Sequence, residues 1–328
     1  MTKKILFPFL FLFIIGVAGC SNAGTSGEIQ SVGLLVPETI NDGVWGTKGY
    51  KGLLSIQSNY DVDVYYKEGI HTKQAVEQAI KEYKENDVNL IFGHGSEYNE
   101  FFNNVASNYP KTHFVSFNGE ATEKNTTSLK FAGYAMGFFG GMTAAHYSKS
   151  DKIGVIAAYE WQPEVQGFLE GAKFENKDIE VRLEYTHNWG DQKVALNLLD
   201  SMIENNVDVV YPAGDGYNVS VIEKIKEEGL YAIGYVSDQS DLGESTVLTS
   251  TVQHADKLYE IVARKFSNGE LPSGNINFDF QDGAISMGNF SPDISKDFKK
   301  EMEKHIETYI ETGKLPNGKK SGSGSPSS

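Results

Sequence analysis

Short apolar runs alternate with amphipathic stretches along most of the chain, and this alternation limits the fold more than any other feature. The apolar runs are bounded by Gly, Pro, Asn or Asp, as buried strands usually are, and span 32–36, 62–66, 90–92, 114–117, 153–157, 181–185, 207–211 and 232–236. The stretches between them carry apolar residues at helical spacing and span 45–57, 72–86, 98–108, 137–147, 164–175, 192–205, 218–228 and 251–266. This order predicts an α/β protein with parallel sheets built from right-handed crossovers.

Eight strand-helix units fit a closed barrel as well as two doubly wound sheets. Two polar breaks favour two lobes, because segments 125–133 and 248–251 are typical of chain that crosses between lobes. Segments 274–280 and 283–290 indicate a last strand or hairpin, followed by a charged helix at 292–311. A length of 328 residues also suits two domains of about 100–200 residues each.

The first twenty residues have the pattern of an export signal. Lys3 and Lys4 precede an apolar stretch at 5–15, which is shorter than the roughly 20 residues of a membrane-spanning helix. Cys20 is the only cysteine, so it has no disulfide partner in the chain, and residues 17–20 resemble the lipobox of bacterial lipoproteins. We therefore expect a signal peptide at 1–19, a lipid on Cys20, a flexible tether at 20–30 and a linker-like tail at 319–328 outside the fold.

Composition and motifs argue against several classes of function. The chain has 44 acidic and 29 basic residues, a net charge of -15, and such a surface repels nucleic-acid phosphates. The sequence has no H-E-x-x-H pair, no G-x-x-x-x-G-K-[ST] loop and no G-x-S-x-G elbow. Its seven histidines show no metal-ligand spacing, and we expect them in surface or capping roles. We expect no metal, no cofactor and no catalytic site, and close helix packing at Gly133, Gly137, Gly140 and Gly141.

The first strand leads into a loop at 37–46 that has the composition of a ligand site. In open α/β sheets ligands bind at the carboxyl ends of strands, where this loop is predicted to lie. Within five residues it offers an amide, a carboxylate and a flat ring, from Asn41, Asp42 and Trp45. The alternative is equally compatible with the spacing: 41–43 forms a turn, and Trp45 is the first core residue of the following helix.

All three tryptophans of the chain lie in predicted strand-end loops: Trp45, Trp161 and Trp189. A ring in such a loop has little sheet to cover. Aromatic rings that face each other across a gap can sandwich a flat heterocycle, while nearby carboxylates accept hydrogen bonds from its polar edge. The tryptophans therefore favour a site for a small ligand with both an aromatic face and polar groups.

Motifs in these loops run in a recognisable order: Asn-Asp-x-x-Trp at 41–45, Gly-x-Gly-Ser at 93–96, Gly-Gly-x-x-Ala at 140–144, Gly-Phe-x-x-Gly-Ala at 167–172, Asn-Trp-x-Asp at 188–191, Ala-Gly-x-Gly at 213–216 and Gly-x-x-x-Asp-Gln at 234–239. In this order the chain resembles the basic membrane protein family, lipoprotein substrate-binding components of ABC importers that include purine-nucleoside binders. The stretches 45–52, 93–98 and 211–219 are most similar to its Med branch, named as positive regulators of competence.

The resemblance implies a type I periplasmic-binding fold with two doubly wound parallel-sheet lobes joined by three crossings. The implied boundaries are 31–133 plus 250–318 for the first lobe and 134–249 for the second. Trp45 and Trp189 match the family's base-stacking aromatics, Asp42 matches its acidic residue in the first loop, and Asp238 matches its ribose-binding carboxylate.

Three positions depart from the nucleoside-binding members. Gly46 stands where they carry an amide, Asn118 where they often carry Asp, and Gln253 where they carry a Lys. The complete set of expected ligand-binding residues is Asn41, Asp42, Trp45, Ser96, Asn118, Trp161, Trp189, Asp215, Asp238 and Gln253.

Together these features predict a monomeric, lipid-anchored protein on the extracytoplasmic face of the cell membrane that captures a nucleoside-like ligand between its lobes and works with an ABC permease. The alternative is a Med-type positive regulator of competence gene expression, acting as a transcriptional activator or as a surface sensor. Direct DNA contact is disfavoured by the export signal, the acidic charge and the lack of a recognisable basic recognition helix.

Overall fold

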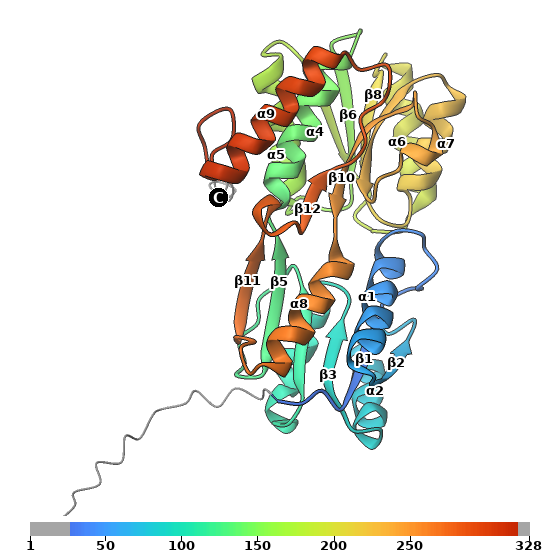
Figure 1. Cartoon of the computed structure of the whole chain (residues 1–328). Coiled ribbons are helices and arrows are strands. Elements are labelled where there is room, and N and C mark those ends of the chain that lie inside the picture. The colour runs from blue at the N-terminus through green and yellow to red at the C-terminus, as the bar shows by residue number, and fades with distance from the viewer. Residues whose placement is uncertain (1–26, 321–328) are drawn as a thin grey trace, which may run out of the picture.

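A computed structural model describes residues 27–320 and contains two α/β lobes stacked end to end (Figure 1). The first lobe contains strands β1 (Ser31–Leu35), β2 (Asp63–Lys67), β3 (Val88–Gly93), β4 (His113–Phe117), β5 (Thr126–Phe131) and β11 (Gly274–Phe278), with helices α1 (Trp45–Tyr60), α2 (Lys73–Glu85), α3 (Tyr98–Val105) and α8 (Ala255–Ser267). Its strands are all parallel, in the order β11-β5-β4-β3-β1-β2.

The second lobe has the same plan. Its strands are β6 (Lys152–Ala157), β7 (Glu180–Tyr185), β8 (Val209–Ala213), β9 (Tyr231–Val236), β10 (Val247–Gln253) and β12 (Ile285–Met287), and its helices are α4 (Gly133–Tyr147), α5 (Pro163–Glu175), α6 (Gln192–Glu204), α7 (Asn218–Glu227) and α9 (Lys296–Thr312). The order is β12-β10-β9-β8-β6-β7, and β12 is antiparallel to β10. Two separate sheets exclude the closed barrel.

Three connections cross between the lobes: β5 to α4, β10 to α8, and β11 to β12. The crossings are hydrogen-bonded to one another, because Ala132 N donates to Phe278 O at 2.8 Å and His254 N donates to Ala284 O at 2.7 Å. This is the type I periplasmic-binding architecture that the resemblance implies. The predicted fold class is therefore confirmed.

The observed lobe boundaries differ from the expected ones. Residues 250–318 were expected in the first lobe, but β10 and β12 pair within the second sheet. The helix expected from Thr251 begins at Ala255 instead, because β10 is buried along all seven of its residues and continues to Gln253. Helix α9 also belongs to the second lobe, where Phe298 stacks on His146 of α4 at 3.8 Å.

Local sequence explains several helix ends and one unusually close helix pair. Thr72, Asp191 and Ser295 each accept a hydrogen bond from the backbone N–H three residues on, which caps α2, α6 and α9.

Helix α4 is buried almost all round and packs on α5 through glycines. A Cβ at Gly137 would lie 1.9 Å from Glu164 O, and one at Gly171 would lie 1.9 Å from Phe138 O. The close packing predicted from the glycine spacing is thus observed at Gly137 and Gly141, where a Cβ would lie 1.9 and 2.0 Å from backbone oxygens, but not at Gly140, where the nearest atoms are 3.4 Å away.

The ends of the described chain are more ordered than expected. Ile29 is only 5% exposed, and Gln30 N donates to Asn89 Oδ1 at 3.0 Å, so the predicted tether does not include these residues. Lys319 lies 2.6 Å from Glu170 and is likewise part of the fold. The predicted signal peptide, the lipid site at Cys20 and residues 321–328 lie outside the described residues. Within 27–320, no helix combines the length and apolar character needed to cross a membrane.

Candidate functional site

The strand directions place the candidate site between the lobes. Strand β5 leaves the first lobe at its carboxyl end and β10 leaves the second lobe at its carboxyl end (Figure 1). The strands parallel to them end at the same edges, so both carboxyl edges face the junction. Eight of the ten predicted ligand residues lie in loops that follow these edges, while Trp45 is the first residue of α1 and Gln253 ends β10.

The carboxyl group of Asp215, in the second lobe, is close enough to carboxylates of the first lobe for them to shift its pKa. Burial, together with the nearby carboxylates of Asp42, Glu164 and Glu97, raises the pKa of its carboxyl group to about 8. Asp42 and Glu97 belong to the first lobe, so loops of both lobes contribute to one acidic environment. Asp215 Oδ1 is buried and has no hydrogen-bond partner among residues 27–320. A buried acceptor without a donor is costly, and a ligand N–H or O–H would satisfy it.

Trp45 is held by a reciprocal pair of hydrogen bonds with His94. Trp45 Nε1 donates to His94 O at 3.1 Å, and His94 Nε2 lies 2.7 Å from Trp45 O. Since a carbonyl can only accept, Nε2 carries the proton, and His94 Nδ1 accepts from the Tyr259 hydroxyl at 2.9 Å. The Trp45 and His94 rings stack at 4.2 Å. The orientation of the Trp45 ring is therefore fixed before any ligand arrives.

The expected surface or capping role of the histidines is wrong for two of them. His94 is fully buried and His113 is 2% exposed. Burial lowers the pKa of each imidazole to about 4, so both are neutral at neutral pH. Sequence alone does not reveal this, because the groups that surround His94 come from α1 and α8, far along the chain.

Trp161 and Trp189 form an aromatic platform on the second lobe. Trp161 is 51% exposed and stacks on Tyr159 with ring centroids 5.7 Å apart, and Trp189 meets both rings edge-on at 5.4 and 5.7 Å. The rings around Trp45, by contrast, are His94, Phe117 and Phe131 of the first lobe. Among the ring contacts of residues 27–320, none joins Trp45 to Trp189. The two candidate stacking residues thus belong to opposite lobes.

Asp42 has a structural role in the first loop. Its Oδ1 accepts from Val44 N at 2.9 Å, from Thr47 N at 3.0 Å and from Thr47 Oγ1 at 3.1 Å, while Oδ2 accepts from Gly46 N at 2.7 Å. These bonds satisfy the free N–H groups at the start of α1. The turn alternative for this stretch therefore fits Asp42, while Asn41 is exposed beside it.

The remaining predicted residues differ in how they are engaged. Asp238 is exposed, and its Oδ2 accepts from Asn289 N at 3.1 Å and from Asn289 Nδ2 at 2.7 Å. Asn118 is exposed with φ 51°, and Ser96 is half-buried on the loop after β3. Gln253 is buried, and its backbone carbonyl accepts from Lys48 Nζ at 2.6 Å.

Sequence reasoning missed the buried amides that brace the second lobe's loops. Gln162 Oε1 accepts from Ala158 N and Tyr159 N, and its Nε2 donates to Glu164 at 2.9 Å. Asn218 and Gln239 are joined at 2.6 Å, and Asn218 Nδ2 also donates to Gly214 O and Asp215 O. These bonds hold the loop of Asp215 in place. A polar residue next to a predicted strand end does not show from sequence alone whether its side chain braces the loop or binds a ligand.

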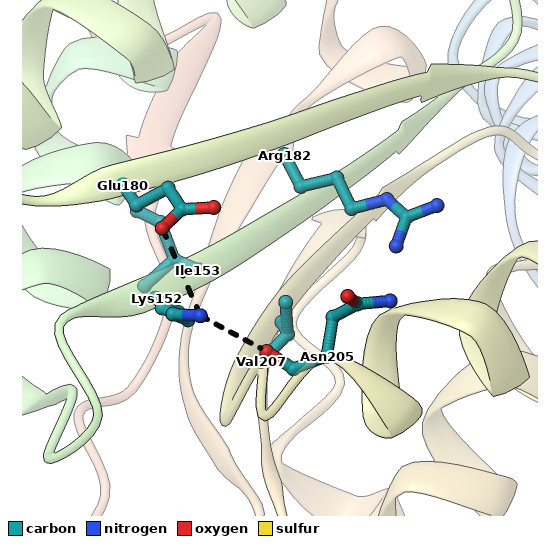
Figure 2. Close-up of a pocket in the computed structure, with 6 residues that line it drawn as sticks. All are labelled: Lys152, Ile153, Glu180, Arg182, Asn205 and Val207. Atoms are coloured by element: carbon teal, nitrogen blue, oxygen red, sulfur yellow. Dashed lines mark hydrogen bonds and ion pairs between the residues drawn. The ribbon is translucent and has the colours of Figure 1, made fainter.

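Two surface hollows lie outside the loops at the carboxyl ends of the strands. One, of about 110 Å³, is lined by Lys152, Ile153, Glu180, Arg182, Asn205 and Val207 at the amino ends of second-lobe strands; Figure 2 shows Lys152 directed toward Glu180 and the Asn205 carbonyl. The other, of about 650 Å³, lies between α1, α8 and the third crossing. Neither contains a predicted ligand residue. We therefore take the interlobe loops as the candidate site.

Comparison with known proteins supports one family across nearly the whole described chain. The profile of the family described as ABC transporter substrate-binding protein PnrA-like matches residues 29–319. The "Transcriptional activator protein med" of Bacillus subtilis (strain 168) is 55% identical over 307 residues, which cover 94% of this chain and 97% of that protein. The crystal structure of a transcriptional activator of the comK gene from Bacillus halodurans has a TM-score of 0.81 and 52% identity, covering 87% of this chain and 99% of that chain. The "ABC transporter nucleoside-binding protein BmpA" of Lactococcus lactis subsp. cremoris (strain MG1363) is 25% identical over 310 residues, covering 83% of this chain and 87% of that protein.

Proposed function

Because the chain belongs to the PnrA-like family of ABC transporter substrate-binding proteins, we propose that it binds a small nucleoside-like ligand between its two lobes. The relative named as a nucleoside-binding protein supports this ligand class. In this proposal the protein captures its ligand without chemical change and passes it to a membrane permease. The lobes move about the three crossings as the ligand enters and leaves.

The unpartnered carboxyl group of Asp215 carries the proposal. It lies at the junction, its Oδ1 lacks a donor among the described residues, and carboxylates of the first lobe raise its pKa together with burial. A nucleoside supplies hydroxyl and ring N–H donors for such a group and a flat base for the half-buried rings of Trp45 and Trp189. A phosphate group would meet Asp42, Glu97, Glu164 and Asp215, so nucleotides are expected to bind far more weakly.

Calorimetry with the purified protein tests this function. Inosine, adenosine, guanosine and uridine are titrated singly, with ribose and inosine monophosphate as comparison ligands. We expect at least one nucleoside to bind with micromolar or tighter affinity and the monophosphate to bind much more weakly. If no nucleoside binds, and small molecules released from the purified protein contain no heterocycle, the proposal is wrong. Release of free base from inosine during the titration would reveal catalysis instead of binding.

Membrane attachment forms a second part of the proposal. Residues 17–20 have the lipobox pattern, and a lipid on Cys20 would hold the protein on the extracytoplasmic face of the cell membrane as a monomer. Radiolabelled palmitate should be incorporated into the parent protein and not into Cys20→Ala. Protease added to intact cells should remove the parent protein; protection from protease in intact cells would contradict this location.

Positive regulation of competence genes is the second candidate function. It is favoured by the high identity, over nearly the full length, to a protein named as a transcriptional activator. The net charge of -15 opposes direct contact with DNA, so we place any regulatory role at the cell surface, as a sensor that reports ligand. Deleting the gene should then lower competence gene expression, and the ligand-binding variants should reproduce the loss. Salt-dependent, sequence-specific binding of the purified protein to promoter DNA would instead favour a direct role.

A further inference from the structure

We propose that Lys48 of α1 contacts the ligand, donating hydrogen bonds to an oxygen of the ring that carries the base. This inference rests on the proposed nucleoside-like ligand and makes it more specific. It predicts that the protein prefers a heterocycle joined to a hydroxylated ring over the free heterocycle.

Position on the helix brings Lys48 close to the candidate stacking residue. Trp45 and Lys48 are three residues apart on α1, and side chains at this spacing lie side by side on one helix face, with about 5–6 Å between their Cβ atoms. Lys48 Nζ also reaches Gln253 O, at 2.6 Å, at the end of β10. Helices α1 and α8 lie side by side here, and the chain crosses between the lobes (Figure 1). The ammonium group thus lies at the end of β10, where the chain crosses between the lobes, on a side chain one helical turn from Trp45.

The hydrogen-bonding capacity of Lys48 is largely unused. An ammonium group has three donors, and the carbonyl of Gln253 takes one of them. In the part of the chain that the structure describes, no carboxylate lies within ion-pair distance of Lys48, whereas Lys67 lies 2.6 Å from Glu82. Burial lowers the pKa of the half-buried Lys48, Asp256 opposes this shift, and Lys51 and Lys257 reinforce it. A half-buried cation with spare donors is suited to an incoming oxygen.

Lys48 and Asp215 have complementary requirements. Among residues 27–320, Asp215 Oδ1 lacks a donor, and Lys48 has donors beyond the one that Gln253 O accepts. A hydroxyl group can both donate and accept, so a hydroxylated ring offers partners to residues of either kind, whereas a free base brings fewer groups of this sort. With the base on Trp45, this ring is the part of the ligand that we place at Lys48.

Calorimetry with inosine and hypoxanthine tests the inference. The Lys48→Met variant keeps the aliphatic stem and loses the ammonium group, and Lys51→Met removes the same charge from an exposed position one turn along α1. We expect Lys48→Met to weaken inosine binding by about tenfold to a hundredfold and to leave hypoxanthine binding within about twofold. Lys51→Met should leave both affinities within about twofold. Thermal melts of both variants check that the fold is retained.

The outcomes separate this inference from the function on which it rests. Failure of the parent protein to bind any nucleoside would overturn both. If the parent binds inosine and Lys48→Met binds it equally well, the inference alone is overturned. Equal weakening of inosine and hypoxanthine, or equal weakening by Lys48→Met and Lys51→Met, would likewise reduce Lys48 to a structural or general electrostatic role.

Discussion

Replacing Asp215 with Asn should stabilise the protein in a pH-dependent way. The pKa of this carboxyl group is raised from 3.8 to about 8 in the fold, so the folded protein holds a proton that the unfolded chain releases near neutral pH. A group with a raised pKa contributes its full stability below the unfolded pKa and loses it as the pH rises through the folded pKa. Asn never ionises, so the variant does not suffer this loss.

The size of the effect follows from the shift. The unfolded pKa of 3.8 lies about three units below pH 7, and each unit is worth about 1.4 kcal/mol. Ionisation of Asp215 in the unfolded chain therefore lowers the free energy of unfolding by at most about 4 kcal/mol near pH 7. A buried amide whose N–H groups lack acceptors costs about 1–3 kcal/mol at any pH. The net gain near pH 7 should therefore be about 1–3 kcal/mol, and near pH 4 the variant should be no more stable than the parent.

Urea unfolding at several pH values measures this effect. The difference in unfolding free energy between Asp215→Asn and the parent should grow by about 1.4 kcal/mol per pH unit from about pH 4 to about pH 8 and then level off. Asp238→Asn is the matched control, because the Asp238 carboxylate is exposed and already accepts three hydrogen bonds; it should gain no stability. A difference for Asp215→Asn that stays constant across this range would refute the reasoning.

Three further predictions concern the ligand, the helix pair and the buried histidine. Trp45→Ala combined with Trp189→Ala should weaken nucleoside binding by at least about thirtyfold, since each stacking ring contributes about 1–3 kcal/mol, and unchanged affinity by calorimetry would reject the stacking hypothesis. Gly137→Ala should destabilise the fold by about 1–3 kcal/mol, because its Cβ would lie 1.9 Å from Glu164 O. Gly140→Ala on the same helix meets its nearest neighbours at 3.4 Å and should be neutral or stabilising in chemical unfolding; equal effects would contradict the close packing. Because the pKa of His94 is lowered in the fold, the stability that it contributes above pH 6.5 is lost as the pH falls toward 4. The His94→Gln variant should therefore take up about one proton fewer than the parent on unfolding near pH 5, which the slope of unfolding free energy against pH measures. An unchanged slope would show that His94 is not the group responsible.

The sequence pattern predicted strands and helices well where each is marked by its own apolar run or amphipathic stretch. The eight expected strands and eight expected helices all occur, with ends shifted by a few residues. The expected helix start at Thr251 failed because Leu248 to Thr251 carries polar, β-branched residues that suit a buried strand as well as a helix start. Whether β10 continues depends on its pairing with β12, about 30 residues further along the chain, and that pairing leaves no local signal.

The candidate site was predictable in place but less so in the roles of its residues. The loops at strand ends were identified because parallel strands must end at a common edge. Asp42 was a candidate ligand residue by type, yet the free N–H groups at the start of α1 occupy both of its oxygens. His94 could not be placed, because its partners Trp45 and Tyr259 come from opposite ends of the first lobe's sequence. Lys48 was not among the predicted ligand residues, because a lysine in an amphipathic helix is usually on the solvent face.

The third crossing has a consequence for how the molecule can be made. Because the chain returns to the first lobe for α8 and β11 and then goes back for β12 and α9, neither lobe is a continuous piece of sequence. A nascent chain that ends before Gly274 leaves β5 as a bare sheet edge, which is a site for aggregation. Separately expressed halves should therefore be insoluble, and pulsed protease digestion during synthesis should find both lobes becoming resistant together, only after the last helix has emerged.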